Sequence, residues 1–174
     1  MDAFLWTLLI LCNVFSIGGL DLAASRSMND LAIRVVHVLP SGSVTVEVTN
    51  TSTAPMKVWR DSNSWGAARW RVLILREGRV ETLFQNPDQR FTRNIPVADK
   101  IAAGAHVRHT LDLNGGNWCG FGQCSSHDQR GIGGKNVTFQ PKERVVVVYD
   151  VPRTEEAVRL HVWYGVAAAS TTVE

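Results

Sequence analysis

The residues best suited to chemistry gather in one segment, GGNWCGFGQCSSHDQRGIGG, which spans residues 115–134. It holds Cys119 and Cys124 with His127 and Asp128 close behind. A catalytic cysteine needs a thiolate with a nearby base, and a zinc site needs more ligands at closer spacing. Two cysteines with four residues between them can instead pair if the chain folds back between them. We predict a Cys119–Cys124 disulfide, formed in an oxidising compartment.

Glycine would give such a ring its shape. Gly120 and Gly122 lie inside it and accept a positive φ without steric cost. A pinned ring would display Trp118 and Phe121, with Arg130 on its flank. We therefore name these three as candidate binding residues. The alternative is that the disulfide only stiffens the segment and both aromatic rings pack back onto the domain, because aromatic side chains usually bury much of their area.

A second aromatic group lies in the stretch VWRDSNSWGAARW, residues 58–70. Trp59 and Trp70 fall on expected strands, so we predict that both are core residues. Trp65 follows a turn-rich run and joins the candidate binding residues. If the Trp65 and Trp118 segments emerge at the same end of the domain, they could form a cleft for a sugar or a peptide.

The histidine pair His106 and His109 does not have the spacing of a metal site. On a strand, an odd offset points the two side chains to opposite faces. His109 shares its face with Val107 and Leu111, which predicts a partly buried, hydrogen-bonded imidazole.

Other reactive patterns are also missing from the sequence. Asp112, Asn114 and Asn117 resemble a calcium loop, but Gln123 stands where an EF-hand needs its bidentate Glu. A nucleophile elbow and a phosphate-binding loop are likewise not found. We expect no catalytic residue, no resident metal and no cofactor, and therefore a protein that is not an enzyme.

The N-terminus indicates export. Residues 3–20 are apolar except at three positions, and small residues near Gly18 suit a signal peptidase. We predict a signal peptide over residues 1–18, a linker over 19–30 and one domain over 31–174, secreted to the extracellular space. An uncleaved membrane anchor, with the domain facing outside the cell, is the alternative. Asn50 and Asn136 begin N-glycosylation acceptor tripeptides, which agree with export.

The charge composition gives no sign of a nucleic-acid partner. The chain of 174 residues carries 18 Lys and Arg against 16 Asp and Glu, a net charge of +2, without a basic run. Binding through phosphate neutralisation would need a clustered basic surface.

Short strands account for most of the chain after residue 30. Apolar alternation in SVTVEVTN places Val44, Val46 and Val48 on one face. The run at Val145–Val148 is apolar on both faces, which is typical of a central strand. A helical turn is expected over residues 154–159. The expected strands cover residues 31–38, 43–50, 70–75, 80–84, 105–113, 144–151 and 158–167.

These patterns predict an all-β domain, an antiparallel β-sandwich of seven to nine strands, with a closed β-barrel as the alternative. The layout resembles immunoglobulin-like modules in the stretch VTVEVTNTSTAPMKVW, which reads as a strand, a polar turn and a return strand. The resemblance is architectural, because the Cys…Trp…Cys spacing of true immunoglobulin domains is missing.

The function expected from these features is a secreted binding module that presents the glycine-rich segment to a protein or glycan partner. A protease inhibitor of the sandwich type and a structural matrix or surface protein are alternatives. A calcium-dependent binder and a hydrolase are weaker ones, because their motifs are not found.

Overall fold

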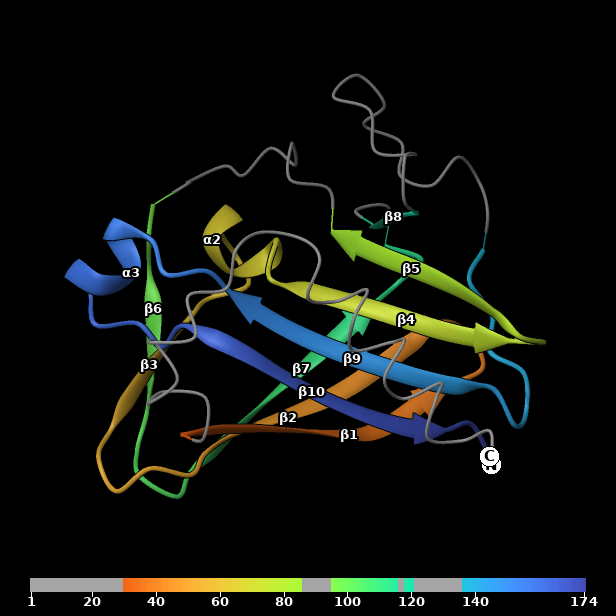
Figure 1. Cartoon of the computed structure of the whole chain (residues 1–174), viewed down its shortest axis with the longest axis horizontal. Coiled ribbons are helices and arrows are strands. Elements are labelled where there is room, and N and C mark those ends of the chain that lie inside the picture. The colour runs from red at the N-terminus through yellow and green to blue at the C-terminus, as the bar shows by residue number, and fades with distance from the viewer. Residues whose placement is uncertain (1–29, 86–94, 116–117, 121–135) are drawn as a thin grey trace.

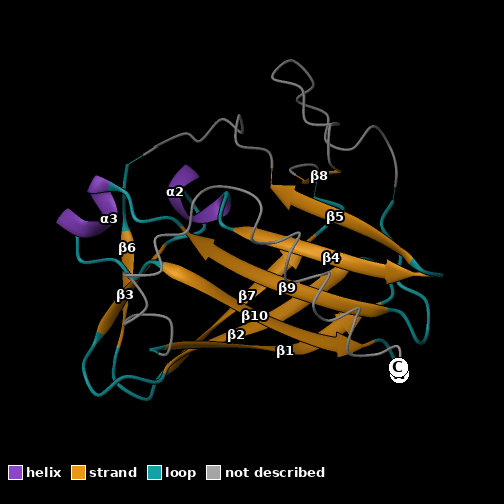
Figure 2. Ribbon diagram, in the orientation of Figure 1, coloured by secondary structure: helices purple, strands orange, loops and turns teal. Residues whose placement is uncertain are grey.

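The computed structural model describes residues 30–85, 95–115, 118–120 and 136–174. These residues form strands and two short helices (Figures 1 and 2). The elements are β1 (Leu31–Leu39), β2 (Ser43–Asn50), β3 (Met56–Trp59), α2 (Ser64–Ala67), β4 (Trp70–Arg76), β5 (Arg79–Gln85), β6 (Ala98–Ile101), β7 (His106–Asp112), β8 (Trp118–Gly120), β9 (Arg144–Val151), α3 (Glu155–Arg159) and β10 (Gly165–Thr172).

Two antiparallel sheets make the two layers of the domain. One has the strand order β1-β2-β7 and the other β10-β9-β4-β5-β8, while β3 and β6 form a separate two-stranded sheet. β1 and β10 lie side by side where the edges of the two large sheets approach each other (Figure 1). The strands of the described part do not close into a barrel, so the barrel alternative is wrong. The prediction of an all-β domain with antiparallel sheets in a sandwich-like arrangement is confirmed.

The core lies between the inner faces of the two sheets. Val44, Val46 and Val48 are at most 1% exposed, as the alternation in β2 predicts. Val145 and Val147 face them from β9 at 0% exposure, within one continuous apolar cluster. β9 pairs with both β10 and β4, so the strand predicted to be central is central.

The β4–β5 hairpin turns at Glu77 and Gly78, as expected. Both residues have positive φ, 44° and 77°. This combination belongs to the type I′ turn, whose twist matches that of the paired strands. Glycine adopts such a φ without cost, whereas glutamate does so against its steric preference.

The structure contradicts two of the expectations about strands. Residues 158–167 are not one strand, because α3 continues to Arg159 and β10 begins only at Gly165. The return strand β3 does not pair with β2 but with β6. The expected helical turn over 154–159 is confirmed: the Thr154 side chain accepts a hydrogen bond from the Ala157 N–H and caps α3.

The described part holds ten strands, more than the seven to nine expected. β6 and β8, of four and three residues, are too short to show a periodic pattern. Within the described ranges, no helix is long and apolar enough to cross a membrane.

Candidate functional site

Trp118 is not displayed at the surface. It lies in β8 opposite Gln85 of β5 and is only 2% exposed. The expectation that its ring binds a partner is therefore wrong, and the alternative, in which the ring packs onto the sandwich, is what the structure has. The physical reason is the large apolar area of an indole, which is stabilised by burial. Phe121 and Arg130 lie outside the described residues.

Cys119 follows Trp118 in β8 and is 4% exposed, opposite Phe84. Cys124 lies outside the described residues, so the Cys119–Cys124 pairing stays a prediction.

The base of the glycine-rich segment is held together by Asn114. Its Nδ2 donates to the Ser41 carbonyl at 2.7 Å and to the Val137 carbonyl at 3.0 Å, while its Oδ1 accepts from the Val137 N–H at 2.6 Å. A Cβ on Gly42 would lie 2.4 Å from the Val137 carbonyl oxygen, so only glycine fits there. Asn114 and Val137, which flank the segment on its two sides, are therefore held together next to Ser41.

Trp65 lies in a helix and not in the loop expected from its turn-rich surroundings. Asn63 begins α2 by accepting a hydrogen bond from the Gly66 N–H at 3.1 Å. The Trp65 ring is partly buried and packs at a tilt against Trp59, with 6.3 Å between ring centroids. Trp59 and Trp70 are 2% and 1% exposed, so their assignment to the core is confirmed.

Trp65 and Trp118 do lie toward the same end of the five-stranded sheet. The register pairs Arg71 with Phe84, and Gln85 with Trp118, so the beginning of β4, just after α2, is level with Trp118. Because Trp118 is buried, the cleft proposed between the two rings does not form from it.

Asn50 cannot carry a glycan in the folded chain. Its side chain is 0% exposed. Its Nδ2 donates to the carbonyls of Ala54, Ile101 and Ala102 at 2.8–3.1 Å, and its Oδ1 accepts from Ser52. The predicted modification at Asn50 is therefore wrong for the folded protein. The residue instead ties the turn after β2 to the turn after β6.

Asn136, the other acceptor, is exposed. Its glycosylation stays a prediction.

His109 behaves as its sequence position predicts. It is partly buried, with a side chain 14% exposed, and its Nδ1 hydrogen-bonds Asp61 Oδ2. Asp61 Oδ1 also accepts from the Trp70 indole N–H at 3.0 Å. The carboxylate thus orients an imidazole and an indole together. Asp61 and His109 are 48 residues apart in the chain, so this contact could not be predicted from the sequence.

Aromatic rings continue from this pair through the core. The His109 ring lies 5.3 Å from Trp70, which lies 4.5 Å from Tyr149. Tyr149 in turn stacks on Trp163 at 5.9 Å with 12° between the ring planes. Burial, aided by the nearby Asp61 charge, raises the pKa of the Tyr149 hydroxyl far above its usual range.

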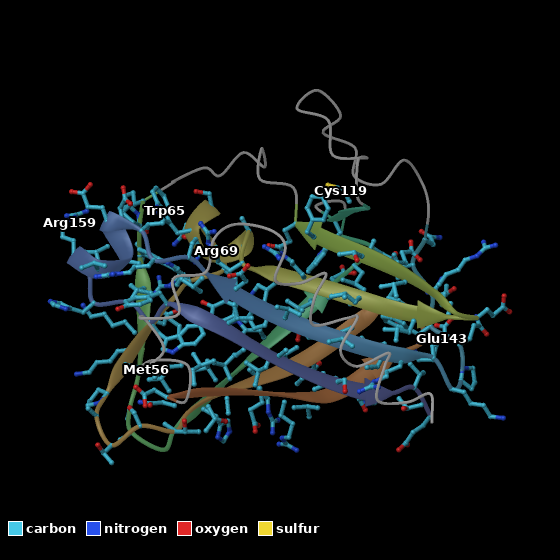
Figure 3. The ribbon with its side chains drawn as sticks, in the orientation of Figure 1. Met56, Trp65, Arg69, Cys119, Glu143 and Arg159 are labelled. Atoms are coloured by element: carbon cyan, nitrogen blue, oxygen red, sulfur yellow. The ribbon has the colours of Figure 1, made fainter. Side chains whose placement is uncertain are left out.

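A pocket of about 740 Å³ opens at the end of the sandwich that carries α3. We call it the end pocket. Its two walls come from residues 51–56, after β2, and from residues 157–158 of α3 together with 161–164 before β10, and Asp30 also contributes to the lining. Trp163, the last ring of the stack, contributes to its lining, and so does Tyr164. Figure 3 shows Met56 and Trp65 at this end, with Glu143 toward the other.

His161 lines the end pocket in a conformation that favours glycine. Its φ is 55°, and it follows the helix cap Leu160. The Val162 N–H donates to the Ala157 carbonyl at 2.8 Å and the His161 N–H to Val158 at 3.2 Å. This is the Schellman arrangement, whose left-handed position is usually glycine. The hydrogen bonds of this cap are made by the backbone, and His161 itself is exposed and is one of the residues that line the pocket.

The end pocket mixes hydroxyl and apolar groups. Thr51 and Thr53 are exposed on one wall, while Val158 on the other is 44% exposed. Tyr164 is partly buried, with the Arg153 guanidinium 5.7 Å from its ring centroid. Sequence reasoning missed this site, because its walls are about a hundred residues apart in the chain.

Among the described residues, no three His, Cys, Asp or Glu side chains are grouped closely enough to hold a metal ion. Comparison with models of known protein families and with curated protein sequences finds no match for this chain.

Proposed function

We propose that the domain is an extracellular binding module whose ligand, the end of a glycan or peptide chain, occupies the end pocket. The observation that carries the proposal is His161. His161 is held in a left-handed conformation at a steric cost and is one of the residues that line the pocket, and residues in sparsely populated backbone conformations often occur at functional sites.

The strand order supports an immunoglobulin-like assignment of the sandwich. The sheet β1-β2-β7 then corresponds to the immunoglobulin strands A-B-E. In the other sheet, the order β10-β9-β4-β5 corresponds to G-F-C-C′. Immunoglobulin domains divide their strands between two sheets in this way. In the variable type, the B–C and F–G loops lie at one end and bind the ligand.

The end pocket lies between the corresponding connections here. Residues 51–56 belong to the β2–β4 connection, and residues 157–164 to the β9–β10 connection. The analogy of position supports a binding role, although a fold by itself does not determine function. Hydroxyls beside apolar and aromatic surface suit a ligand that needs both hydrogen bonds and an apolar contact.

Titration of the ¹⁵N-labelled protein with a panel of oligosaccharides and short peptides tests this proposal. We expect one ligand class to shift the amide resonances of residues 51–56 and 157–164. His161→Gly should weaken that ligand at least about tenfold, because it removes a pocket side chain but keeps the left-handed cap.

Lys142→Gly is the matched control. Lys142 also has a positive φ, 72°, and is exposed, but it is not part of the pocket lining. The Lys142→Gly variant should relieve a similar backbone strain and leave the affinity for the ligand unchanged. Equal affinities of wild type and His161→Gly, or ligand shifts confined to other residues, would reject the pocket as the site.

The glycine-rich segment forms a second part of the proposal, as a loop presented to a partner. Its support is the set of hydrogen bonds by which Asn114 holds Ser41 and Val137, because they fix the two ends of the stretch that contains the segment. Peptide mapping without reduction should find Cys119 linked to Cys124. If both cysteines alkylate as free thiols in the secreted protein, the pinned-ring proposal is wrong.

Export is tested by N-terminal sequencing and intact mass of the secreted product. We expect the chain to begin after Gly18 and any N-glycan to reside on Asn136. Retention in the cytosol with residues 1–18 intact would contradict the extracellular assignment.

A further inference from the structure

The outward face of the β1-β2-β7 sheet brings together charges that are far apart in the sequence. The register aligns Arg34, Glu47 and Arg108 directly across the three strands. The row on one side of these three residues holds His37, Thr45 and Thr110. The row on the opposite side holds Ala32, Thr49 and His106. Most of these side chains are exposed or partly exposed, so the face is a polar grid.

Glu47 lies at the centre of this grid and is already neutralised. Its side chain is 9% exposed and accepts from Arg34 at 2.9 Å and from Arg108 at 3.2 Å. His106 Nε2 lies 3.6 Å from it. The hydrogen bond from Arg34 is the main cause that lowers the pKa of the Glu47 carboxyl. The carboxylate therefore orients two guanidinium groups instead of repelling anions from an open surface.

The arginines remain available to a partner. Their side chains are 66% and 60% exposed, although each gives a nitrogen to Glu47. A guanidinium has five N–H donors, so donors remain on both. Because one strand separates them, their backbones are about 10 Å apart. Two cations hold one buried anion between them, which leaves a local excess of positive charge that the overall net charge conceals.

We propose that this face binds an acidic polysaccharide, one whose sulfate or carboxylate groups contact Arg34 and Arg108 while its hydroxyls contact the threonines. The positive charges of the two arginines are complementary to the anionic groups of such a polysaccharide. Thr45, Thr49 and Thr110 lie in the neighbouring rows of the grid and add hydroxyls that can hydrogen-bond the sugar. The nine grid positions hold no Phe, Tyr or Trp ring, the large aromatic surfaces on which nucleic-acid bases usually stack. This inference does not rest on the end pocket, which lies on other residues.

Binding of a fluorescent heparin hexasaccharide to the full chain, followed by anisotropy over a salt series, tests the proposal. The double variant Arg34→Gln/Arg108→Gln should weaken binding at least about tenfold at low salt and flatten its salt dependence. Glu47→Gln should strengthen binding, because it removes the negative charge with which both guanidinium groups are paired.

The matched control is Arg79→Gln/Arg144→Gln, which removes the same two charges from exposed positions on the other sheet. It should retain near wild-type affinity. An equal loss in both double variants would show attraction by net charge alone and overturn the proposal. So would tighter binding of single-stranded DNA or phosphatidylserine vesicles than of the hexasaccharide, or no measurable hexasaccharide binding. Circular dichroism confirms that each variant is folded.

Discussion

At the scale of single residues, Asn50 joins two turns through hydrogen bonds to three backbone carbonyls. Asn50→Ala should lower the free energy of unfolding by about 2–4 kcal/mol, because it removes the donor from the buried Ile101 carbonyl bond and from two part-buried ones. Urea denaturation measures the loss. Asn136→Ala, at the exposed acceptor, should change stability by less than about 0.5 kcal/mol. Similar effects at both positions would contradict the role assigned to Asn50.

Asp61 accepts from both an imidazole and an indole, so its removal should affect two partners at once. Asp61→Ala should cost about 1–3 kcal/mol, because Trp70 and His109 both lose their acceptor. Asp61→Asn keeps an oxygen for one of them and should cost less. Thermal unfolding compares the two variants, and equal losses would show that shape alone matters at this position.

At the scale of elements, the β4–β5 hairpin is closed by a residue unsuited to its position. Glu77→Asn should raise the free energy of unfolding by about 0.5–1 kcal/mol, since asparagine accepts the left-handed conformation that the type I′ turn requires. Glu77→Ala, which shortens the side chain without that preference, serves as the control in the same denaturation series. If asparagine stabilises no more than alanine, the turn assignment is wrong.

Elements with a strong local pattern could be predicted from the sequence. β2 and β9 match their expected bounds, because alternating or continuous valines leave little choice of register. The strand expected over 158–167 failed because the Thr154 cap and the His161 turn end a helix within it. β3 pairs with β6 and not β2, which depends on contacts between distant segments that no local pattern records.

At the scale of the whole molecule, the candidate sites depend on which strands become neighbours. The end pocket joins residues 51–56 with residues 157–164, and the charged grid joins Arg34 with Arg108. The apolar and polar faces of single strands, and the partly buried state of His109, follow from local alternation and could be predicted. Which strands lie side by side does not follow from local pattern, so the burial of the large Trp118 ring in the core could not be decided from the sequence.

Burial of Tyr149 should make the fold sensitive to alkali. Its pKa is raised in the folded chain, mainly by burial, so stability is fully present below about pH 10, where tyrosine in the unfolded chain begins to ionise. Above that pH the unfolded state loses its proton first, and the free energy of unfolding should fall. Urea denaturation between pH 8 and 11.5 measures this fall.

Tyr149→Phe is the control for alkaline unfolding. It removes the titrating group, so its stability should depend less on pH over the same range. Tyr164→Phe, at the more exposed tyrosine, should keep the wild-type profile. A Tyr149→Phe profile parallel to that of the wild type would assign the alkaline loss to other groups.

The stacked rings that run from His109 through Trp70 and Tyr149 to Trp163 have a practical consequence. Trp163 lines the end pocket, so a molecule that binds there should change the surroundings of an emitting indole. Occupancy can therefore be followed by intrinsic ultraviolet emission, without attaching any dye to the protein.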